Sequence, residues 1–162
     1  MATKNFKPEM GKGDQGFTDL FGGRRVAKTD RRVKLNALLD DLNALLGLLR
    51  TGVRAAAVKK ELVSVQKALV AAAGIVAGTK ADLAPETRAL ETLIDSIAKT
   101  LRPQKKFVLP GANEAEALAH YARAKARVCE ILAWELKAKA PAVYLNRLSD
   151  YLFLAALRCA RK

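Results

Sequence analysis

The sequence predicts an all-α protein, a five-helix up-down bundle that follows a glycine-rich N-terminal arm. Apolar residues recur at three- and four-residue spacing through most of the 162 residues, as they do on buried helix faces. Leu, Ala and Val dominate the predicted core, because only 6% of the residues are aromatic. No segment shows the two-residue alternation of a half-buried strand. We therefore expect an arm at 1–30 and a single helical domain at 31–162.

The first two helices are expected at about 31–57 and 58–77. A leucine stripe from Leu35 to Leu49 marks the buried face of the first helix. Gly52 is the expected corner between the two helices. Gly78 is a suitable C-cap for the second, because glycine adopts the left-handed conformation without strain.

The remaining helices are expected at about 85–101, 113–138 and 141–159. Pro85 suits the first turn of the third helix, and Pro103 ends that helix. Asn113 and Glu116 have the spacing of a capping box at the start of the fourth. Pro141 opens the fifth.

The chain is strongly basic, with a net charge of +13 and a pI near 10, which is compatible with a nucleic-acid ligand. Aromatic residues do not interleave with the cations, so stacking platforms for single strands are missing. A polyanionic small ligand such as a nucleoside triphosphate fits equally well, and a solvated basic surface is the third interpretation. We expect no nucleic-acid partner.

Cysteine spacing and hydropathy indicate the cellular compartment in which the protein is expected. Cys129 and Cys159 have neither metal-ligand nor redox spacing, so we expect reduced thiols and no metal site. No signal-peptide pattern precedes the polar N-terminus, and no apolar run reaches the roughly 20 residues of a membrane span. These features predict a cytoplasmic protein without a membrane partner.

The arm contains a glycine-rich stretch from Gly11 to Asp19, followed by three cations between Arg24 and Lys28. Glycines allow backbone N–H groups to approach phosphate, and Lys12 supplies positive charge. The stretch is not a Walker A loop, because it lacks the Gly-Lys-Ser/Thr ending and a preceding strand. A flexible tail is the alternative interpretation.

Two helices carry ionisable residues in apolar surroundings. Asp40 lies in the leucine pattern, where a buried carboxylate needs a partner, although a solvated face is equally compatible. Arg123, Arg127 and Glu130 share one face of the fourth helix and could grip phosphates, with an intrahelical salt-bridge ladder as the alternative. We expect His120 to be structural. Trp134 is expected to pack.

The segment from Tyr144 to Phe153 places polar residues within an apolar helical pattern. They are Asn146, Arg147, Ser149 and Asp150. Buried polar groups are costly unless they have partners, so this cluster indicates a site or a specific interface. An ordinary amphipathic helix with Asn146, Arg147 and Asp150 on its solvent side is the alternative. Because no catalytic triad is arguable, the chemistry of an enzyme here would be carried by a bound cofactor.

Several motifs occur in a familiar order along the chain. They are Gly13-Asp14-x-Gly16-x-Thr18, Gly22-Gly23-x-Arg25-Val26-x-Lys28, Asp40-Asp41-Leu42-Asn43, Leu90-Glu91-x-x-Ile94-Asp95, Phe107-Val108-Leu109-Pro110-Gly111, the row His120, Arg123, Arg127 and Glu130, and Asn146-Arg147-Leu148-Ser149-Asp150. Together they resemble the trimeric ATP:cob(I)alamin adenosyltransferases, which are five-helix bundles. The resemblance spans nearly the whole chain.

The resemblance implies transfer of the 5′-deoxyadenosyl group from ATP, with Mg²⁺, to the cobalt of reduced cobalamin, with release of triphosphate. It also implies a homotrimer that binds ATP between the arm of one subunit and the last two helices of another. The implied ATP-binding residues are Lys12, Gly13, Thr18, Asp19, Lys28, Arg127, Glu130 and Asn146. Asp40, Arg123 and Phe107 would form the corrinoid pocket and the subunit contact. Arg127 and Phe107 would be catalytic.

The chain departs from the family pattern at cationic positions. Val128 and Ile131 stand where the family has arginines in the fourth helix, and Lys12 is displaced by one position from the family's lysine. A catalytically impaired paralogue that binds corrinoid or ATP as carrier, sensor or partner is therefore the alternative to an active transferase.

Overall fold

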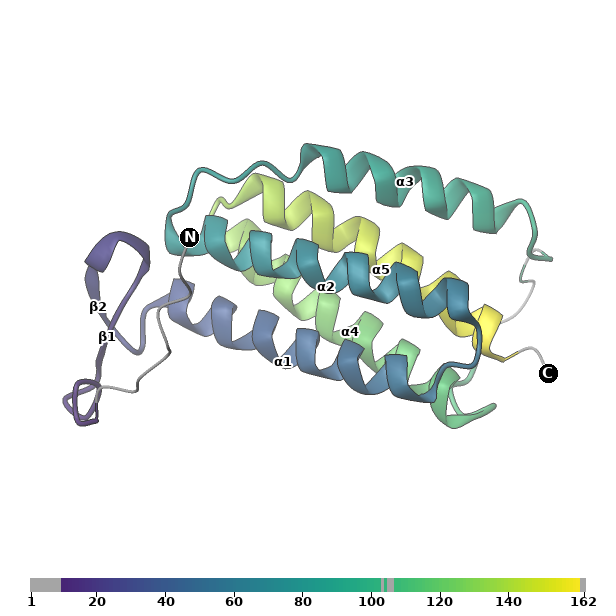
Figure 1. Ribbon diagram of the computed structural model, residues 1–162, viewed down its shortest axis with the longest axis horizontal. Helices are drawn as coiled ribbons and strands as arrows, with labels where there is room; N and C mark the ends of the chain where they lie inside the picture. The colour runs from purple at the N-terminus through teal and green to yellow at the C-terminus, as the bar shows by residue number, and fades with distance from the viewer. Residues whose placement is uncertain (1–9, 103, 105–106, 161–162) are drawn as a thin grey trace.

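Five α-helices and a small β-hairpin make up residues 10–102, 104 and 107–160, which the computed structural model describes (Figure 1). The hairpin consists of β1 (Phe17–Asp19), a short 3-10 helix (Phe21–Gly23) and β2 (Arg25–Ala27). The helices are α1 (Arg31–Gly52), α2 (Ala56–Ala77), α3 (Ala84–Ala98), α4 (Glu114–Glu135) and α5 (Lys139–Cys159). The predicted all-α, five-helix bundle is confirmed.

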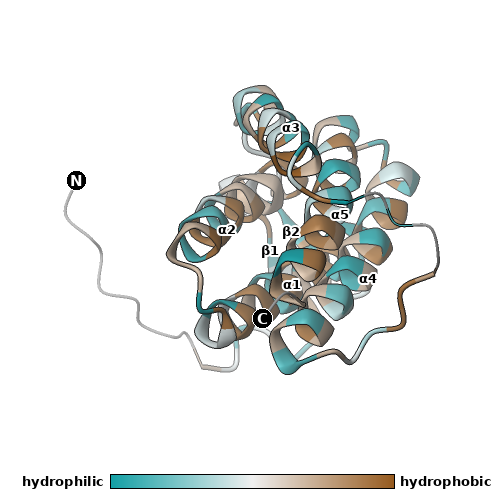
Figure 2. Cartoon of the chain, turned by 90° about the vertical axis from the view of Figure 1, so that its right-hand side faces the viewer, coloured by the Kyte–Doolittle hydropathy of each residue, from teal (hydrophilic) through white to brown (hydrophobic). Residues whose placement is uncertain are grey.

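The core lies between α1, α2, α4 and α5. Leu35, Leu39, Leu42, Leu46 and Leu49 of α1 are all buried, which is the leucine stripe expected from the sequence. Apolar residues face the space between the helices and polar residues face outward (Figure 2). Helix α3 packs mainly against α5 and buries only Leu90 and Ile97, so it forms an outer layer.

The predicted caps are confirmed. Gly78 ends α2 with φ 111°, and Pro85 lies in the first turn of α3. The side-chain oxygen of Asn113 accepts a hydrogen bond of 3.0 Å from the backbone N–H of Glu116. The carboxylate of Glu116 in turn accepts from the backbone N–H of Gly111 at 2.8 Å. The first bond satisfies a donor that the helix N-terminus leaves without a partner, and the second ties the preceding turn to the helix.

Helix ends are the main difference from the sequence prediction. Helix α1 ends at Gly52 rather than near residue 57, because Val53 is extended (φ −74°, ψ 135°). Helix α4 ends at Glu135 rather than near residue 138, because Lys137 takes a left-handed conformation with φ 56°. Helix α3 ends at Ala98, three residues before Leu101. The end of α1 confirms the expected corner at Gly52, whereas the ends of α3 and α4 have no strong residue-type signal.

The expectation that no segment of the chain forms a strand is wrong for the described part of the arm. Strands β1 and β2 pair antiparallel, with Thr18 opposite Val26. Gly22 and Gly23 both have φ 79°, a conformation that favours glycine, and they reverse the chain between the strands. Strands of three residues are too short to produce a recognisable alternation. Residues 1–9 of the predicted arm lie outside the described residues.

The hairpin projects beyond the N-terminal end of α1 rather than folding over the bundle (Figure 1). Asp30 joins the two parts by capping α1. Its side chain accepts a 2.8 Å hydrogen bond from the Arg32 backbone N–H and a 2.7 Å hydrogen bond from the Arg32 guanidinium. Among the helices described, none is long and apolar enough to cross a membrane.

Candidate functional site

The arm gathers two predicted ligand residues and Arg25 around its hairpin. Nζ of Lys12 lies 3.0 Å from Oδ2 of Asp19, and a guanidinium nitrogen of Arg25 lies 3.5 Å from Oδ1 of the same carboxylate. Arg25 also donates a 2.9 Å hydrogen bond to the Lys12 carbonyl. The Lys12 ammonium, followed by Arg25, lowers the pKa of Asp19. Asp19 therefore orders the two cations on an exposed hairpin.

Gly13 and Lys28 come together in the same hairpin. A Cβ atom built on Gly13 would lie 2.9 Å from Nζ of Lys28, so the Lys28 side chain lies over the glycine backbone. The Lys28 backbone N–H donates to the carbonyl of Gly16 at 2.8 Å, which fixes the two segments side by side. Thr18 is half-buried in β1. The arm thus presents the Lys28 ammonium close to glycine backbone, with Lys12 next to Gly13 in sequence, which is a chemically suitable arrangement for phosphate.

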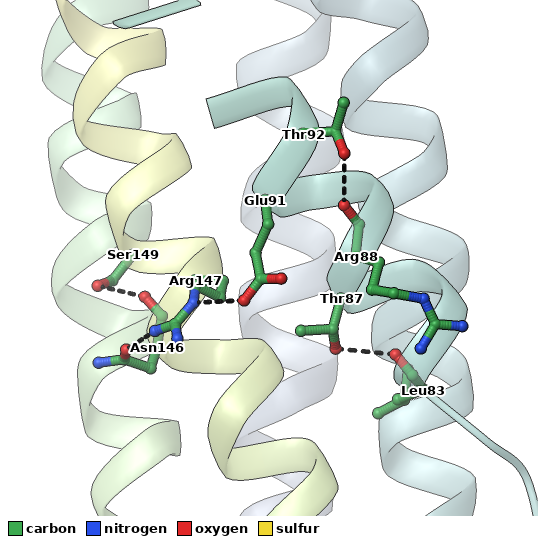
Figure 3. Close-up of polar contacts among 8 residues, drawn as sticks. All are labelled: Leu83, Thr87, Arg88, Glu91, Thr92, Asn146, Arg147 and Ser149. Atoms are coloured by element: carbon green, nitrogen blue, oxygen red, sulfur yellow. Dashed lines mark hydrogen bonds and ion pairs between the residues drawn. The ribbon is translucent and has the colours of Figure 1, made fainter. Parts of the chain in front are cut away.

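A four-residue polar network crosses from α3 through α5 to α4. Oε1 of Glu91 accepts a 2.8 Å hydrogen bond from Nε of Arg147, and a terminal nitrogen of Arg147 donates to Oδ1 of Asn146 at 2.6 Å. Nδ2 of Asn146 then donates to Oε1 of Glu130 at 3.1 Å. Figure 3 shows Glu91 reaching from α3 to Arg147, beside Asn146 on α5.

The polar residues Asn146, Arg147 and Asp150 of α5 lie at the edge of the bundle, which agrees with the amphipathic-helix interpretation, although two of them also have side-chain partners. Asn146 and Arg147 are half-buried, and only Asp150 is exposed. Ser149 is buried and satisfied locally, because its hydroxyl donates to the Asn146 carbonyl at 2.9 Å. Two of the predicted ATP ligands, Asn146 and Glu130, are therefore brought into direct contact, whereas Ser149 serves the helix.

The predicted ionic row on α4 is divided among different partners. The Arg123 guanidinium lies 5.7 Å from the ring centroid of Phe153, a cation–π distance, whereas Glu130 contacts Asn146. Arg127 is exposed. Among the ion pairs of the described residues, none joins Arg123 or Arg127 to Glu130. The salt-bridge ladder is therefore wrong for this chain.

Asp40 is exposed in the single chain, which agrees with the solvated-face interpretation of this residue. Its neighbours Leu39 and Leu42 fill the core, and the helical turn places Asp40 on the outer side between them. Asp41 instead pairs with Lys125 of α4 at 2.6 Å. An exposed carboxylate such as Asp40 is solvated by water, so it needs no cation from its own chain.

Several large apolar side chains are exposed. Phe107, which the resemblance assigns to the corrinoid pocket, is fully exposed in the connection between α3 and α4, and Leu109 is mostly exposed. Trp134, expected to pack, is 48% exposed on α4 together with Tyr121 (53%), Val128 (50%) and Ile131 (59%). Contiguous exposed apolar side chains mark interaction surfaces. We call the last four residues the α4 apolar face.

Two buried groups near these residues have structural roles. His120 is mostly buried and packs edge-on against the Phe153 ring at 6.0 Å between centroids, in agreement with the structural role expected for it. Cys129 is a buried free thiol, and burial raises its pKa to about 11. A thiol with so high a pKa is a poor nucleophile.

An apolar groove of about 390 Å³ lies elsewhere, between α2 and α3. It is lined by Ala57, Lys60, Glu61, Ser64, Val65, Ala68, Glu86, Ala89, Leu90, Leu93 and Tyr144. None of the predicted ligand residues lines this groove. The groove follows from the light packing of α3, and the polar chemistry of the chain is concentrated in the arm and around Asn146.

Sequence reasoning missed the connection of Glu91 to the site. Glu91 belongs to a quoted motif, but one carboxylate on an amphipathic helix gives no sign of a partner on another helix. It also missed the pairing of Asp19 with Lys12 and Arg25, because a hairpin of such short strands was not expected. The position of Asp19 close to a glycine turn was the one sequence signal that could have indicated its pairing with the cations of the arm.

Comparisons with known proteins now place these residues in a family. The sequence profile of cobalamin adenosyltransferase matches residues 9–159. A corrinoid adenosyltransferase of Citrobacter freundii is 36% identical over 158 residues, which cover 89% of each chain. That of Bacillus subtilis (strain 168) is 35% identical, covering 89% of this chain and 81% of its own. The corrinoid adenosyltransferase PduO of Citrobacter freundii is 36% identical, but only 47% of its length is matched.

Solved structures show the same architecture. A variant PduO-type ATP:corrinoid adenosyltransferase from Lactobacillus reuteri, complexed with cobalamin and ATP, has a TM-score of 0.86 and 27% identity, covering 93% of this chain and 89% of its own. Another variant, complexed with ATP, has a TM-score of 0.83 and 28% identity over 90% of this chain and 89% of its own. The family expected from the motifs is confirmed, and the chain belongs to the cobalamin adenosyltransferase family.

Proposed function

We propose that this protein is a corrinoid adenosyltransferase that converts ATP and reduced cob(I)alamin into adenosylcobalamin and triphosphate. The observation that carries the proposal is the contact between Asn146 and Glu130, at 3.1 Å, in a chain that belongs to this family. The motifs assign both side chains to ATP, and their direct contact supports their binding one ligand together.

The proposed reaction is a substitution at the ribose C5′ carbon. Reduced cobalt supplies the electron pair of the new Co–C bond. The C5′–O bond breaks, and triphosphate leaves with the electron pair of that broken bond. The protein's contribution is to hold the nucleotide, exclude water and stabilise the charge of the leaving group. The exposed Arg127 is suited to the last task, since guanidinium binds phosphate oxygens in pairs.

ATP would be shared between copies of the chain. The arm carries Lys12, Gly13, Thr18, Asp19 and Lys28 on a hairpin that projects away from its own bundle (Figure 1). A projecting hairpin is well placed to reach the α4–α5 cluster of a second copy. Mg²⁺ would accompany the triphosphate, where it neutralises phosphate charge.

The α4 apolar face supports an interface between copies. Its four residues are spaced seven, three and three positions apart, so they follow one side of the helix. Asp40 is exposed on α1 and Arg123 is half-buried on α4, and opposite charges of this kind across a subunit contact would satisfy each other. The number of subunits, three, follows from the family resemblance.

Phe107 supports a corrinoid pocket near the connection between α3 and α4. A fully exposed phenylalanine would gain free energy by packing against a large planar ligand. We therefore assign Phe107, with Asp40 and Arg123, to the corrinoid side of the site.

The division into an arm and a bundle near residue 30 is likewise a proposal, as is a cytoplasmic location.

The test combines an assay with a measurement of assembly. Purified protein, ATP, Mg²⁺ and chemically reduced cobalamin should produce the visible spectrum of adenosylcobalamin, and sedimentation equilibrium should give the mass of a trimer. Ile131→Asp should lower both the mass and the rate, whereas Leu109→Asp should leave the mass unchanged. A monomeric wild-type chain with full turnover would refute the shared site.

A second function is favoured by one observation. Val128 and Ile131 are exposed apolar side chains where the family has arginines, so the triphosphate would meet fewer cations. An impaired paralogue that carries or senses corrinoid or ATP fits this change. Saturable binding of ATP or cobalamin without formation of adenosylcobalamin would establish that function in place of the transferase.

A further inference from the structure

We propose that Glu91 and Arg147 are positioning residues that fix the amide of Asn146 so that it offers a hydrogen-bond donor, rather than an acceptor, to the nucleotide. This inference rests on the proposed function, because it takes Asn146 and Glu130 as ATP ligands. It adds two residues from outside the predicted ligand set, one of which lies on α3. It also fixes which end of the Asn146 amide, nitrogen or oxygen, lies beside Glu130.

The polarity follows from what each neighbour can do. A guanidinium has only donors, so the Asn146 atom that lies 2.6 Å from Arg147 must be the amide oxygen. A carboxylate has only acceptors, so the atom that lies 3.1 Å from Glu130 must be the amide nitrogen. Rotating the amide by 180° would place donor against donor and acceptor against acceptor. The two neighbours together therefore exclude the reversed amide.

Glu91 holds the outer end of this arrangement. Its Oε1 accepts from Nε of Arg147 at 2.8 Å, and this bond leaves the terminal nitrogens of the same guanidinium directed toward Asn146. Arg147 alone has a long, flexible side chain that loses considerable rotamer freedom when it is ordered. The Glu91 carboxylate pre-organises that side chain, as an outer partner does for an inner ligand.

The pair itself contributes little to folding. The side chains of Arg147 and Glu91 are 38% and 42% exposed, and ion pairs of that exposure add little stability. Its loss should therefore change ligand binding without unfolding the bundle. A purely structural residue would behave in the opposite way, lowering stability and leaving the affinity of the folded protein unchanged.

The consequence for the nucleotide is a rule of complementarity. Asn146 keeps a second N–H on Nδ2 after donating to Glu130, and that carboxylate keeps acceptor capacity on its other oxygen. A ligand that spans Nδ2 of Asn146 and the free oxygen of Glu130 must bring an acceptor to the first atom and a donor to the second. A ribose hydroxyl group, or the paired amino group and ring nitrogen of adenine, meets this requirement.

The experiment is a double-mutant cycle of Mg²⁺-ATP affinity on the full-length chain, measured by calorimetry. Asn146→Ala should raise the Kd about tenfold, and Glu91→Ala about fivefold, as expected for one charge-assisted hydrogen bond and for its partial misplacement. In the double variant, the Glu91 change should add less than about twofold, because it acts through Asn146.

Three further variants sharpen the result. Glu91→Gln keeps an acceptor for Arg147 and should stay within about twofold of the wild-type Kd. Asp95→Ala removes an exposed carboxylate one turn further along α3 and should have no effect. Asn146→Asp replaces the donor by a carboxylate opposite Glu130, so it should bind ATP more weakly than Asn146→Ala. Thermal unfolding of each variant checks that the fold is retained.

The outcomes separate the inference from the proposed function. If the wild-type chain binds no ATP, the proposed function is wrong and the inference falls with it. If the wild type binds ATP and Asn146→Ala weakens binding, an equal effect of Glu91→Ala in both backgrounds overturns the inference alone. Wild-type affinity in Asn146→Asp would overturn the assigned polarity.

Discussion

The Tyr151→Phe substitution gives a quantitative test of how α5 is anchored independently of the ligand site. The hydroxyl of Tyr151 donates a 2.9 Å hydrogen bond to Oε2 of Glu61 on α2, and Arg158 donates to the same oxygen at 2.7 Å. Tyr151 is completely buried, and burial followed by the nearby Glu61 charge raises its pKa. The phenol is therefore a neutral donor at physiological pH.

The magnitude follows from which groups lose their partners. Tyr151→Phe removes one hydrogen bond to a charged group and leaves Glu61 paired with Arg158, so we expect a loss of about 1.5 kcal/mol in the free energy of unfolding. Glu61→Ala leaves a buried phenol and a largely buried guanidinium without their acceptor, and should cost about 3–5 kcal/mol. For a chain of this size, the first change corresponds to roughly 3–6 °C in Tm.

The assay is chemical and thermal unfolding of the two variants and the wild type at one protein concentration, because assembly changes apparent stability. Mg²⁺-ATP affinity of the folded variants should equal that of the wild type. Arg158→Lys provides a control that keeps the charge. Equal losses for Tyr151→Phe and Glu61→Ala would refute the reasoning, because they would show that the second donor does not keep the carboxylate satisfied.

Three other predictions concern charge and reactivity. Arg127→Ala should weaken Mg²⁺-ATP binding about 10- to 100-fold by removing charge-assisted contacts, and it should leave Tm unchanged. The control Arg88→Ala, which removes an exposed arginine of α3, should change neither the ATP affinity nor Tm. Calorimetry measures the affinity and thermal unfolding measures Tm. The Arg32 side chain lowers the pKa of Asp30 to about 2, so the stability Asp30 contributes is present above its unfolded pKa near 3.8 and is lost as the pH falls through about 2. Asp30→Asn should flatten that part of the stability curve, as acid unfolding followed by circular dichroism can determine. At pH 8, maleimide should label the half-buried Cys159 before the buried Cys129, and mass spectrometry of the labelled peptides gives the order.

The bundle was predictable because its signals are repeated over many residues. The leucine stripe of α1, the Asn113 cap and the Gly78 C-cap all depend on local sequence, and each is present in the structure. The hairpin was not predictable in the same way. Its strands have three residues each, and their pairing depends on glycine backbone angles that the residue type permits without requiring.

The polar network was predictable only in part. The α5 motif drew attention to Asn146, and the family resemblance to Glu130, but neither indicated that the two side chains touch. Glu91 could not be connected with them, because α3 joins the site through a contact between helices far apart in sequence. Contacts of this kind depend on how α3 packs on α5, which no local pattern specifies.

The changes at Val128 and Ile131 bear on where triphosphate charge would be neutralised. These positions are apolar on an exposed face of α4, whereas the arm places Lys28 beside the backbone of Gly13 and Lys12 beside Asp19. On the proposed function, the triphosphate charge is therefore neutralised less by α4 of one copy and more by the arm of another. Cations on an exposed hairpin are screened more strongly by salt than cations on a covered helix. ATP affinity in this chain should consequently depend steeply on both ionic strength and assembly, and a more apolar α4 face favours that assembly.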